Sequence, residues 1–201
     1  MKSRILHKGA ELFFRYGVKT VTMDSIATDL GISKKTIYQH FPDKDSIVYE
    51  VVKSFIEQDL KKWEELDKLY PNVIEKIFKS FEMTKDLFTQ MNPRLLYEIQ
   101  KYFPNAYELF SDHGEKCIHE NLIADFKKGA QIGYFRNDID FELLARLRMA
   151  EVNLVFNPDF YPNNKLPLFE TQLVLLDIFM RGILTENGLK LYTSYQNKLT
   201  Q

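Results

Sequence analysis

The stretch from residue 22 to residue 41 reads TMDSIATDLGISKKTIYQHF, and its spacing is that of two short helices that cross over a tight turn. Such a corner needs a small residue where the helices touch, and Ala27 supplies it. The turn needs a residue that tolerates positive φ, which Gly31 does because it has no Cβ. A branched apolar residue must fill the angle, and Ile37 meets this need. The spacing of four and then six residues between these positions predicts a helix-turn-helix.

Residues that begin and end helices flank this corner. Thr22 and Ser33 are good N-caps for its two helices. Pro42 ends the second helix, since proline lacks an N–H and restricts the residue before it. Residues 3–16 have apolar side chains at helical spacing, and Gly17 follows them at a position that favours glycine. A three-helix unit is therefore expected at the start of the chain.

The outer side of the second helix carries hydroxyl, amide and basic side chains. No acidic residue lies between Asp29 and Asp43. Lys and Gln can read base edges in the major groove, whereas hydroxyl groups and helix N-termini bind phosphates. The alternative is a pair of core helices with a solvated face, but such a face usually includes Glu or Asp. The predicted DNA contacts are Thr22, Ser33, Lys34, Lys35, Thr36, Tyr38, Gln39, His40 and Lys44.

The charge distribution agrees weakly with this prediction. The whole chain of 201 residues has a formal net charge of -1. Residues 1–42 contain seven Lys or Arg against three acids, a balance of +4, so the remainder sums to -5. A basic start on an acidic body is expected of a DNA-binding unit, although a difference of this size arises often by chance.

The run from Thr22 to Ile47 resembles the N-terminal domain of the TetR family of repressors. Its specific feature is Thr-Ile-Tyr-x-His-Phe at residues 36–41, followed by Lys44. The resemblance covers about residues 5–50, and Lys35 stands where that family often has glycine.

The resemblance implies an all-α fold of about nine helices, with a three-helix helix-turn-helix head on a larger C-terminal helical bundle. It also implies a homodimer on a palindromic operator in double-stranded DNA, and an effector pocket whose filling releases the DNA. We therefore expect a DNA-binding domain over residues 1–46, and an effector-binding and dimerisation domain over residues 47–201.

The rest of the chain has helical spacing too. Asp43 is an N-cap for a long helix to about Leu69, and Pro and Gly are scarce at 7 and 8 residues. The Pro- and Asn-rich segment 157–167 is the best candidate for a long loop. Further helices are expected near residues 72–91, 93–102, 105–131, 140–156 and 167–186, followed by a frayed tail.

The helix expected over 167–186 is apolar on nearly all sides, so both of its sides must be covered. One side can face the chain's own core and the other a second copy. The helix over 140–156 could pair with it to form a four-helix interface. A buried central helix in a monomer is the alternative, which the family resemblance disfavours. The predicted interface residues are Leu144, Leu147, Phe169, Leu173, Leu176, Met180 and Ile183.

Aromatic residues gather on the helices expected between residues 72 and 131. Such a cluster suits an apolar or aromatic effector held by one or two polar groups. Ordinary core packing is the alternative, and it is favoured for each residue taken separately. The candidate pocket residues are Phe78, Phe81, Phe88, Tyr97, Tyr102, Phe103, Phe110, His113 and Cys117.

The sequence contains none of the common catalytic or cofactor motifs, namely a serine elbow, His-Glu-x-x-His, a P-loop or a dinucleotide loop. His113 and Cys117 are four residues apart, but they lack an evident third catalytic member, and neither a metal nor a cofactor is expected. Cys117 is the single cysteine, which excludes an intrachain disulfide. We expect no signal peptide and no membrane span, and hence a cytoplasmic protein that is not an enzyme.

The remaining alternative is a helix-turn-helix protein controlled by a protein partner, with no small-molecule effector. The two possibilities differ in the interior of the C-terminal domain. A ligand-responsive protein needs a cavity of at least ~300 Å³, whereas the alternative predicts a solid core.

Overall fold

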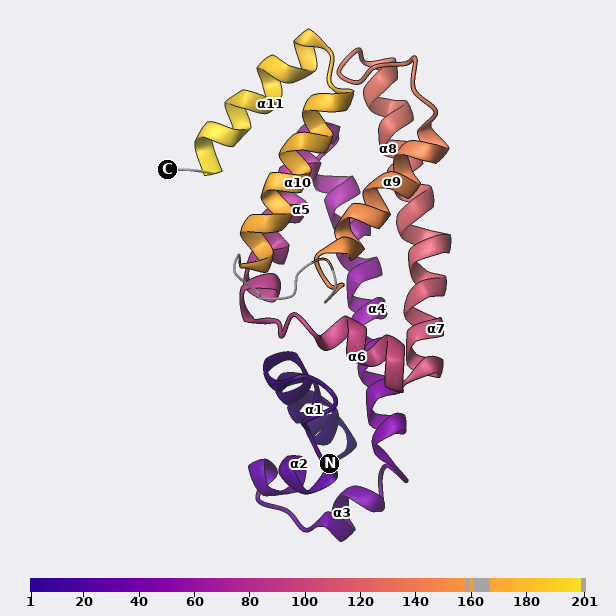
Figure 1. The fold of residues 1–201 in the computed structure, drawn as a ribbon, viewed down its shortest axis with the longest axis vertical. Coiled ribbons are helices and arrows are strands. Elements are labelled where there is room, and N and C mark those ends of the chain that lie inside the picture. The colour runs from indigo at the N-terminus through magenta and orange to yellow at the C-terminus, as the bar shows by residue number, and fades with distance from the viewer. Residues whose placement is uncertain (158–159, 161–166, 200–201) are drawn as a thin grey trace.

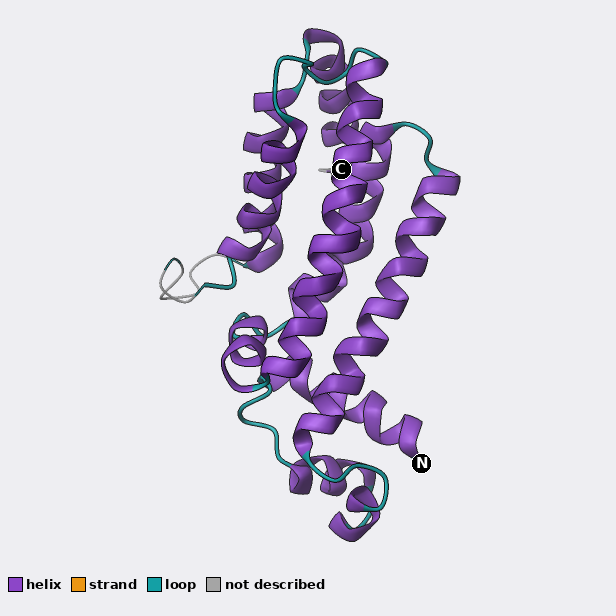
Figure 2. Cartoon of the chain, turned by 90° about the vertical axis from the view of Figure 1, so that its right-hand side faces the viewer, coloured by secondary structure: helices purple, strands orange, loops and turns teal. Residues whose placement is uncertain are grey.

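The structure, a computed structural model, describes residues 1–157, 160 and 167–199, and most of these residues are helical (Figures 1 and 2). The prediction of an all-α fold with an N-terminal helix-turn-helix is confirmed. The helices are α1 (Lys2–Tyr16), α2 (Met23–Leu30), α3 (Lys34–Tyr38), α4 (Lys44–Leu69), α5 (Val73–Gln90), α6 (Leu95–Tyr102), α7 (Pro104–His113), η1 (Gly114–Ile118, a π-helix), α8 (His119–Gln131), α9 (Phe141–Leu154), α10 (Leu168–Ile183) and α11 (Glu186–Leu199).

The caps that begin α2, α3 and α4 are the ones predicted. The Thr22 hydroxyl accepts a hydrogen bond from the Ser25 amide at 3.1 Å. The Ser33 hydroxyl accepts one from the Thr36 amide at 3.1 Å, and the Asp43 carboxylate accepts one from the Ser46 amide at 2.8 Å. Each side chain satisfies an amide that has no partner within the first turn of its helix. These polar residues therefore fix where the short helices start.

The corner between α2 and α3 has the predicted geometry. Gly31 lies in the left-handed region at φ 64° and ψ 31°. Ala27 is 5% exposed and Ile37 fully buried, so both side chains lie on the inner side of the corner. The outer side of α3 is left to solvent by the same geometry.

A head formed by α1, α2 and α3 lies at one end of the molecule, and α4 runs from it along a body formed by α5 to α11 (Figure 1). In the body, α4 packs on α7 and α5, α8 packs on α9, and α5 packs on α10 and α11. Because α7, η1 and α8 follow one another without a break, the helix expected over residues 105–131 is one rod of three segments.

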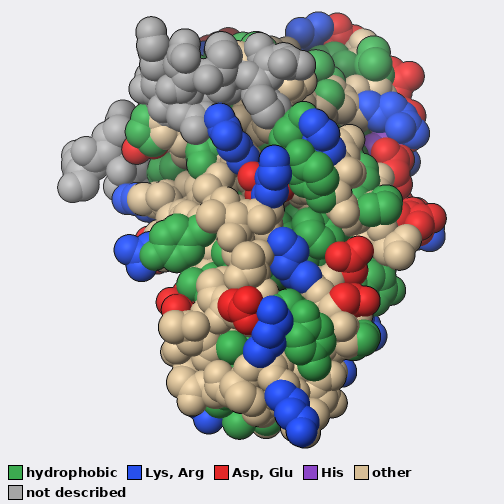
Figure 3. Space-filling model, turned by 60° about the horizontal axis from the view of Figure 1, so that its bottom comes forward, with side chains coloured by type: hydrophobic (Ala, Val, Ile, Leu, Met, Phe, Trp, Pro, Cys, Tyr) green, Lys and Arg blue, Asp and Glu red, His purple; other side chains and the backbone are tan. Residues whose placement is uncertain are grey.

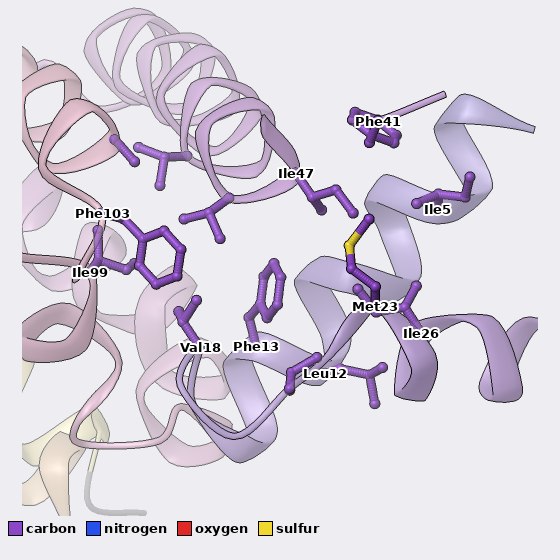
Figure 4. Packing of buried hydrophobic residues seen from close by; sticks show 14 of the residues in the cluster. Ile5, Leu12, Phe13, Val18, Met23, Ile26, Phe41, Ile47, Ile99 and Phe103 are labelled. Atoms are coloured by element: carbon purple, nitrogen blue, oxygen red, sulfur yellow. The ribbon is translucent and has the colours of Figure 1, made fainter. Parts of the chain in front are cut away.

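The head and the body share one hydrophobic core. The cluster that includes Phe13 and Val18 of the head continues to Ile47 of α4 and to Ile99 and Phe103 beside α6 (Figure 4). Because α4 runs from the head into the body and the two share a core, the head cannot rotate without displacing side chains of the body.

Hydrogen bonds from three segments fasten the end of α1 to the body. The Asn92 amide donates to the Phe14 carbonyl oxygen at 2.7 Å. The Lys19 amide donates to the Glu98 carboxylate at 2.7 Å. The Lys44 ammonium donates to the carbonyl oxygens of Val18 and Val21, each at 2.9 Å. The end of α1 and the segment after it are thus held by α4, by the α5–α6 connection and by α6.

The chain end differs from the expectation. The frayed tail predicted after residue 186 is wrong, because residues 186–199 form α11. The helix predicted to reach residue 186 stops at Ile183, where Phe135 and Leu184 form an isolated antiparallel bridge. The Thr185 hydroxyl then accepts from the Gly188 amide at 3.1 Å and begins the new helix. A contact between segments that are distant in the sequence therefore ends the helix before the predicted residue. The predicted long loop falls largely on residues 158–159 and 161–166, outside the described residues.

The corner glycine gives a stability prediction. Gly31→Val should lower the free energy of unfolding by about 1–2 kcal/mol, because a branched side chain is strained at positive φ. An added Cβ would meet no atom within 4 Å, so the cost arises from the backbone alone. Denaturant unfolding checks this, with Gly31→Asn as the control, since asparagine enters the left-handed region more readily. Equal stability of the two variants would contradict the assigned turn.

Candidate nucleic-acid interface and interior cavity

Most of the predicted DNA contacts share one exposed surface. Ser33, Lys34, Lys35, Gln39 and His40 are exposed around α3, and so is Thr22 at the start of α2. The Tyr38 side chain is 46% exposed, and Thr36 is half-buried. The end of the molecule that carries α2 and α3 comes forward in Figure 3, where Lys and Arg side chains lie among hydrophobic side chains, other side chains and backbone in its lowest part. The surface therefore combines positive charge with hydrogen-bonding groups.

Lys34 already has an acidic neighbour on this surface. Its ammonium lies 2.9 Å from the Asp24 carboxylate, and the two side chains are 50% and 64% exposed. Asp24 raises the pKa of Lys34 through this hydrogen bond. An exposed ion pair contributes little to stability. A phosphate can therefore replace Asp24 as the partner of Lys34 at small cost.

Lys44 begins α4, as predicted, and its side chain binds the protein itself. Its ammonium is turned toward the protein, where it binds the Val18 and Val21 carbonyl oxygens and lies 5.4 Å from the centre of the Phe103 ring. Burial lowers the pKa of this ammonium. The side chain thus closes the end of the turn after α1, because those carbonyl oxygens have no helical partner. At this position the backbone amides at the start of α4 are the groups that can bind a phosphate.

An interior cavity of about 350 Å³ lies along the body. Its wall is built by α1, α4, α5, α6, α9, α10 and the α7–η1–α8 rod, and it is largely apolar. Phe13, Phe14 and Val18 of the head belong to this wall. The cavity therefore borders the head directly, without an intervening layer of side chains.

The structure brings four of the nine predicted pocket residues to this cavity, namely Phe81, Phe88, Phe110 and His113. The other five are Phe78, Tyr97, Tyr102, Phe103 and Cys117. Phe78 packs on Tyr192 and Tyr195 of the unpredicted helix α11.

Two of the other four residues are exposed. Tyr97 and Tyr102 are 37% and 40% exposed on α6. Phe103 belongs to the core shared with the head. Cys117 is a half-buried free thiol of η1 that does not line the cavity. Helical spacing alone does not indicate which way these rings turn.

Hydrogen-bonded acids and bases lie in the cavity wall. The His113 ring lies 3.1 Å from the Asp59 carboxylate, which links α7 to α4. The Lys76 ammonium lies 2.6 Å from Asp125 in the wall and 2.5 Å from Asp67 outside it. Burial raises the pKa of Asp125, and the hydrogen bond from Lys76 opposes this shift. Each of these polar groups of the wall thus has a partner, as buried polar groups must.

Two further polar residues of the wall, Arg148 and Gln172, were not predicted. The Arg148 guanidinium donates to Glu151 at 3.3 Å and lies 5.7 Å from the centres of the Phe81 and Phe179 rings. Burial lowers the pKa of Arg148. Gln172 is 1% exposed and donates to the Val152 carbonyl oxygen at 2.8 Å. The signal that could have found it is a glutamine directly before the apolar run Leu173–Leu176 of α10.

The outer face of α9 and α10 leaves large apolar side chains in solvent. Leu143 is 65% exposed and Leu147 49%, while Val174 is 59% and Ile178 63%. In each helix the two residues are four positions apart, so they lie on the same side of that helix. The four residues together form the exposed stripe. Both helices lie side by side in Figure 1.

This stripe differs from the predicted interface. Leu144, Phe169, Leu176, Met180 and Ile183 are buried in the chain's own core. Leu173 is half-buried, and Leu147 alone of the seven is exposed. Both sides of α10 are apolar, so the sequence could not indicate which side packs inward.

The described residues form neither a metal-binding cluster nor a membrane-spanning helix. These residues contain no group of three or more His, Cys, Asp or Glu placed to hold a metal ion. None of the helices among them is both long and apolar enough to cross a membrane.

Comparison with known proteins gives one consistent family. Residues 5–51 match the profile described as "Bacterial regulatory proteins, tetR family". The chain is 28% identical to the HTH-type transcriptional regulator YvaF of Bacillus subtilis, over 91% of this chain and 95% of that one. It is 23% identical to the HTH-type transcriptional repressor KstR2 of Mycobacterium tuberculosis, over 72% and 74%.

A solved structure shares the fold over nearly the whole chain. It is a transcriptional regulator from Saccharomonospora viridis, in complex with choline, with a TM-score of 0.73 and 20% identity. The match covers 92% of this chain and 98% of that one. The relatives are transcriptional regulators and not enzymes. On the helix-turn-helix geometry and on these matches, the chain belongs to the TetR family of DNA-binding transcriptional regulators.

Proposed function

We propose that this regulator is a cytoplasmic repressor that binds a palindromic operator as a homodimer and leaves it when a small molecule fills the interior cavity. Within this proposal, residues 1–46 bind DNA, and residues 47–201 bind the effector and form the dimer. Its main support is the cavity of about 350 Å³, whose wall includes Phe13, Phe14 and Val18 of the DNA-binding head.

The proposed contact surface is α3 with its flanking residues. Lys34, Lys35 and Gln39 are placed to meet base edges or phosphates in the major groove. Thr22, Ser33, Thr36, Tyr38 and His40 add hydroxyl and ring N–H groups around them. The starts of α2 and α4 add backbone amides. Two heads about 34 Å apart would bind successive turns of one face of the DNA.

The proposed dimer forms through the exposed stripe of Leu143, Leu147, Val174 and Ile178. Four large apolar side chains in solvent on two adjacent helices are costly, and a second copy would cover them. Two helices from each subunit then make a four-helix interface with twofold symmetry. The buried residues that the sequence predicted for the interface would support this surface from within.

Effector control is favoured over control by a protein partner because the core is not solid. The cavity exceeds the ~300 Å³ of the smallest usual ligand sites. The related regulator that was solved with choline carries a small molecule in the same fold. A ligand in this cavity would press on α1 as well as on the body, and would thereby change the distance between the two heads of a dimer.

The DNA-binding surface is tested by replacing Lys34 and Lys35 with Ala. Operator affinity should fall, and the slope of log affinity against log salt should flatten by about 0.9 for each phosphate that the protein no longer neutralises. Electrophoretic or fluorescence titration at several salt concentrations measures this. Replacement of Lys61 and Lys62, exposed on α4, is the matched control. An unchanged salt slope in the Lys34 and Lys35 variant would show that the surface is wrongly assigned.

The dimer surface is tested by Ile178→Asp. A charge at this position should convert the dimer to monomers in analytical ultracentrifugation, because burying an unpaired carboxylate opposes association. Leu69→Asp is the matched control, since Leu69 is 68% exposed on α4, away from the stripe. A variant that stays dimeric at micromolar concentration would place the interface elsewhere.

Effector control is tested with a cavity-filling variant. A low-molecular-mass fraction of cell extract should weaken operator binding by the unaltered protein. Met149→Trp, which fills the cavity wall, should bind the operator and lose this response. Met83→Trp is the control, as Met83 is 45% exposed on α5. If no fraction ever changes operator affinity, the alternative of a protein partner is preferred.

A further inference from the structure

The cavity is long. Its wall follows α5 from Lys76 to Met91, the C-cap of that helix, which is about 22 Å at 1.5 Å per residue. Its volume of about 350 Å³ is spread along this length. A ligand that contacts both ends is therefore elongated.

The two ends of the cavity differ in chemistry. The end nearer Lys76 contains the ion pairs and Arg148. The other end is formed by apolar residues of α1, α4, α5 and α6, among them Phe14, Val52 and Met91. A ligand that matches both ends has a polar group at one end and an apolar chain that points toward α1.

Gln172 needs a hydrogen-bond donor from the cavity. Its Nε2 donates to the Val152 carbonyl oxygen at 2.8 Å, which fixes the orientation of the amide. Its Oε1 is buried and has no hydrogen-bond partner among the described residues. A buried acceptor without a partner is rare and costly. Because Gln172 lines the cavity, a ligand O–H or N–H group can supply the missing bond.

Arg148 lies on the same α9–α10 wall as Gln172. Its guanidinium has five N–H donors, and among the described residues it donates to Glu151 at 3.3 Å. Arg148 and Val152 are one turn apart on α9, and Gln172 binds the Val152 carbonyl oxygen. A ligand group that donates to Gln172 therefore binds near Val152, about one helical turn from Arg148.

The acids and bases of the wall already have partners among the residues that the structure describes. Asp125 pairs with Lys76 at 2.6 Å, Arg148 with Glu151 at 3.3 Å, and the Asp59 carboxylate lies 3.1 Å from the His113 ring. A carboxylate or ammonium group brought into this cavity would have to compete with these contacts, whereas an uncharged polar group would not. The existing contacts therefore favour an uncharged polar group.

We propose that the cavity binds an uncharged, elongated amphiphile, a long-chain alcohol or primary amide, whose polar group donates a hydrogen bond to Gln172 and whose tail is directed toward Phe14. This ligand class belongs to the effector site and rests on the proposed function. Arg148 lies over Phe81, and Phe81 to Met91 spans about 15 Å of α5. An extended alkyl chain advances about 1.25 Å per carbon, so about 12 carbons fill this length.

The wild-type chain tests the proposal directly. Calorimetric titration of the full protein without DNA would compare decan-1-ol with 1-methoxydecane, decanoate, decylammonium and hexan-1-ol. Decan-1-ol should bind tightest. The methyl ether should bind about 10-fold more weakly because it accepts but cannot donate. Equal binding of the alcohol and the ether, tighter binding of either charged probe, or no dependence on chain length would overturn the proposal.

A variant identifies the residue responsible. Gln172→Met keeps the shape of the side chain and removes the buried acceptor, so the alcohol and the ether should bind it equally. Gln131→Met, exposed on α8, should keep the wild-type preference. A preference for the alcohol that survives in Gln172→Met would exclude Gln172 as the acceptor. If this variant does not fold, the comparison of alcohol with ether on the unaltered protein still decides the matter.

Operator binding separates this inference from the proposed function. Decan-1-ol that binds with the expected preference and leaves operator affinity unchanged would support the ligand class and contradict effector control. A cell fraction that releases DNA, together with no binding of any uncharged amphiphile, would support effector control and overturn the ligand class.

Discussion

The contact on which the rest of this structure depends is the shared core at the end of α1. Phe13 and Val18 pack against Ile99 and Phe103, and Lys44 closes the turn between them by binding two backbone carbonyl oxygens. Close-packed side chains transmit displacement because they leave little free space. The position of the head is therefore set by the side chains of the body, and the helix-turn-helix is held as one face of a larger unit.

The same contact lies beside the cavity. Phe13 and Val18 belong both to the core and to the cavity wall, so the space proposed for an effector and the support of the DNA-binding head have residues in common. Coupling between two sites requires an element whose arrangement both of them influence. Here α1 meets that requirement by direct contact, and the Asp59–His113 pair adds a second link between α4 and α7.

Polar residues are few in the interior, and they divide into two kinds. Lys76 satisfies Asp67 and Asp125 and ties together the far ends of α4, α5 and α8, which is a structural role. Gln172 lines the cavity and keeps a buried acceptor that has no partner among the described residues. Since an unsatisfied buried group costs stability, such a residue is expected at a binding site rather than in an ordinary core.

Local features could be predicted from the sequence alone: the caps Thr22, Ser33 and Asp43, the glycine turn at Gly31, the inward Ile37 and the order of the helices through α10. These follow from short-range rules in which each residue acts on its own turn of chain. Contacts between distant segments decide that the Lys44 side chain points inward and that residues 186–199 form α11. They also select which side of α10 is buried and which aromatic residues border the cavity. An apolar side chain on a helix is equally suited to core, cavity or interface, and the choice depends on neighbours that are distant in the chain.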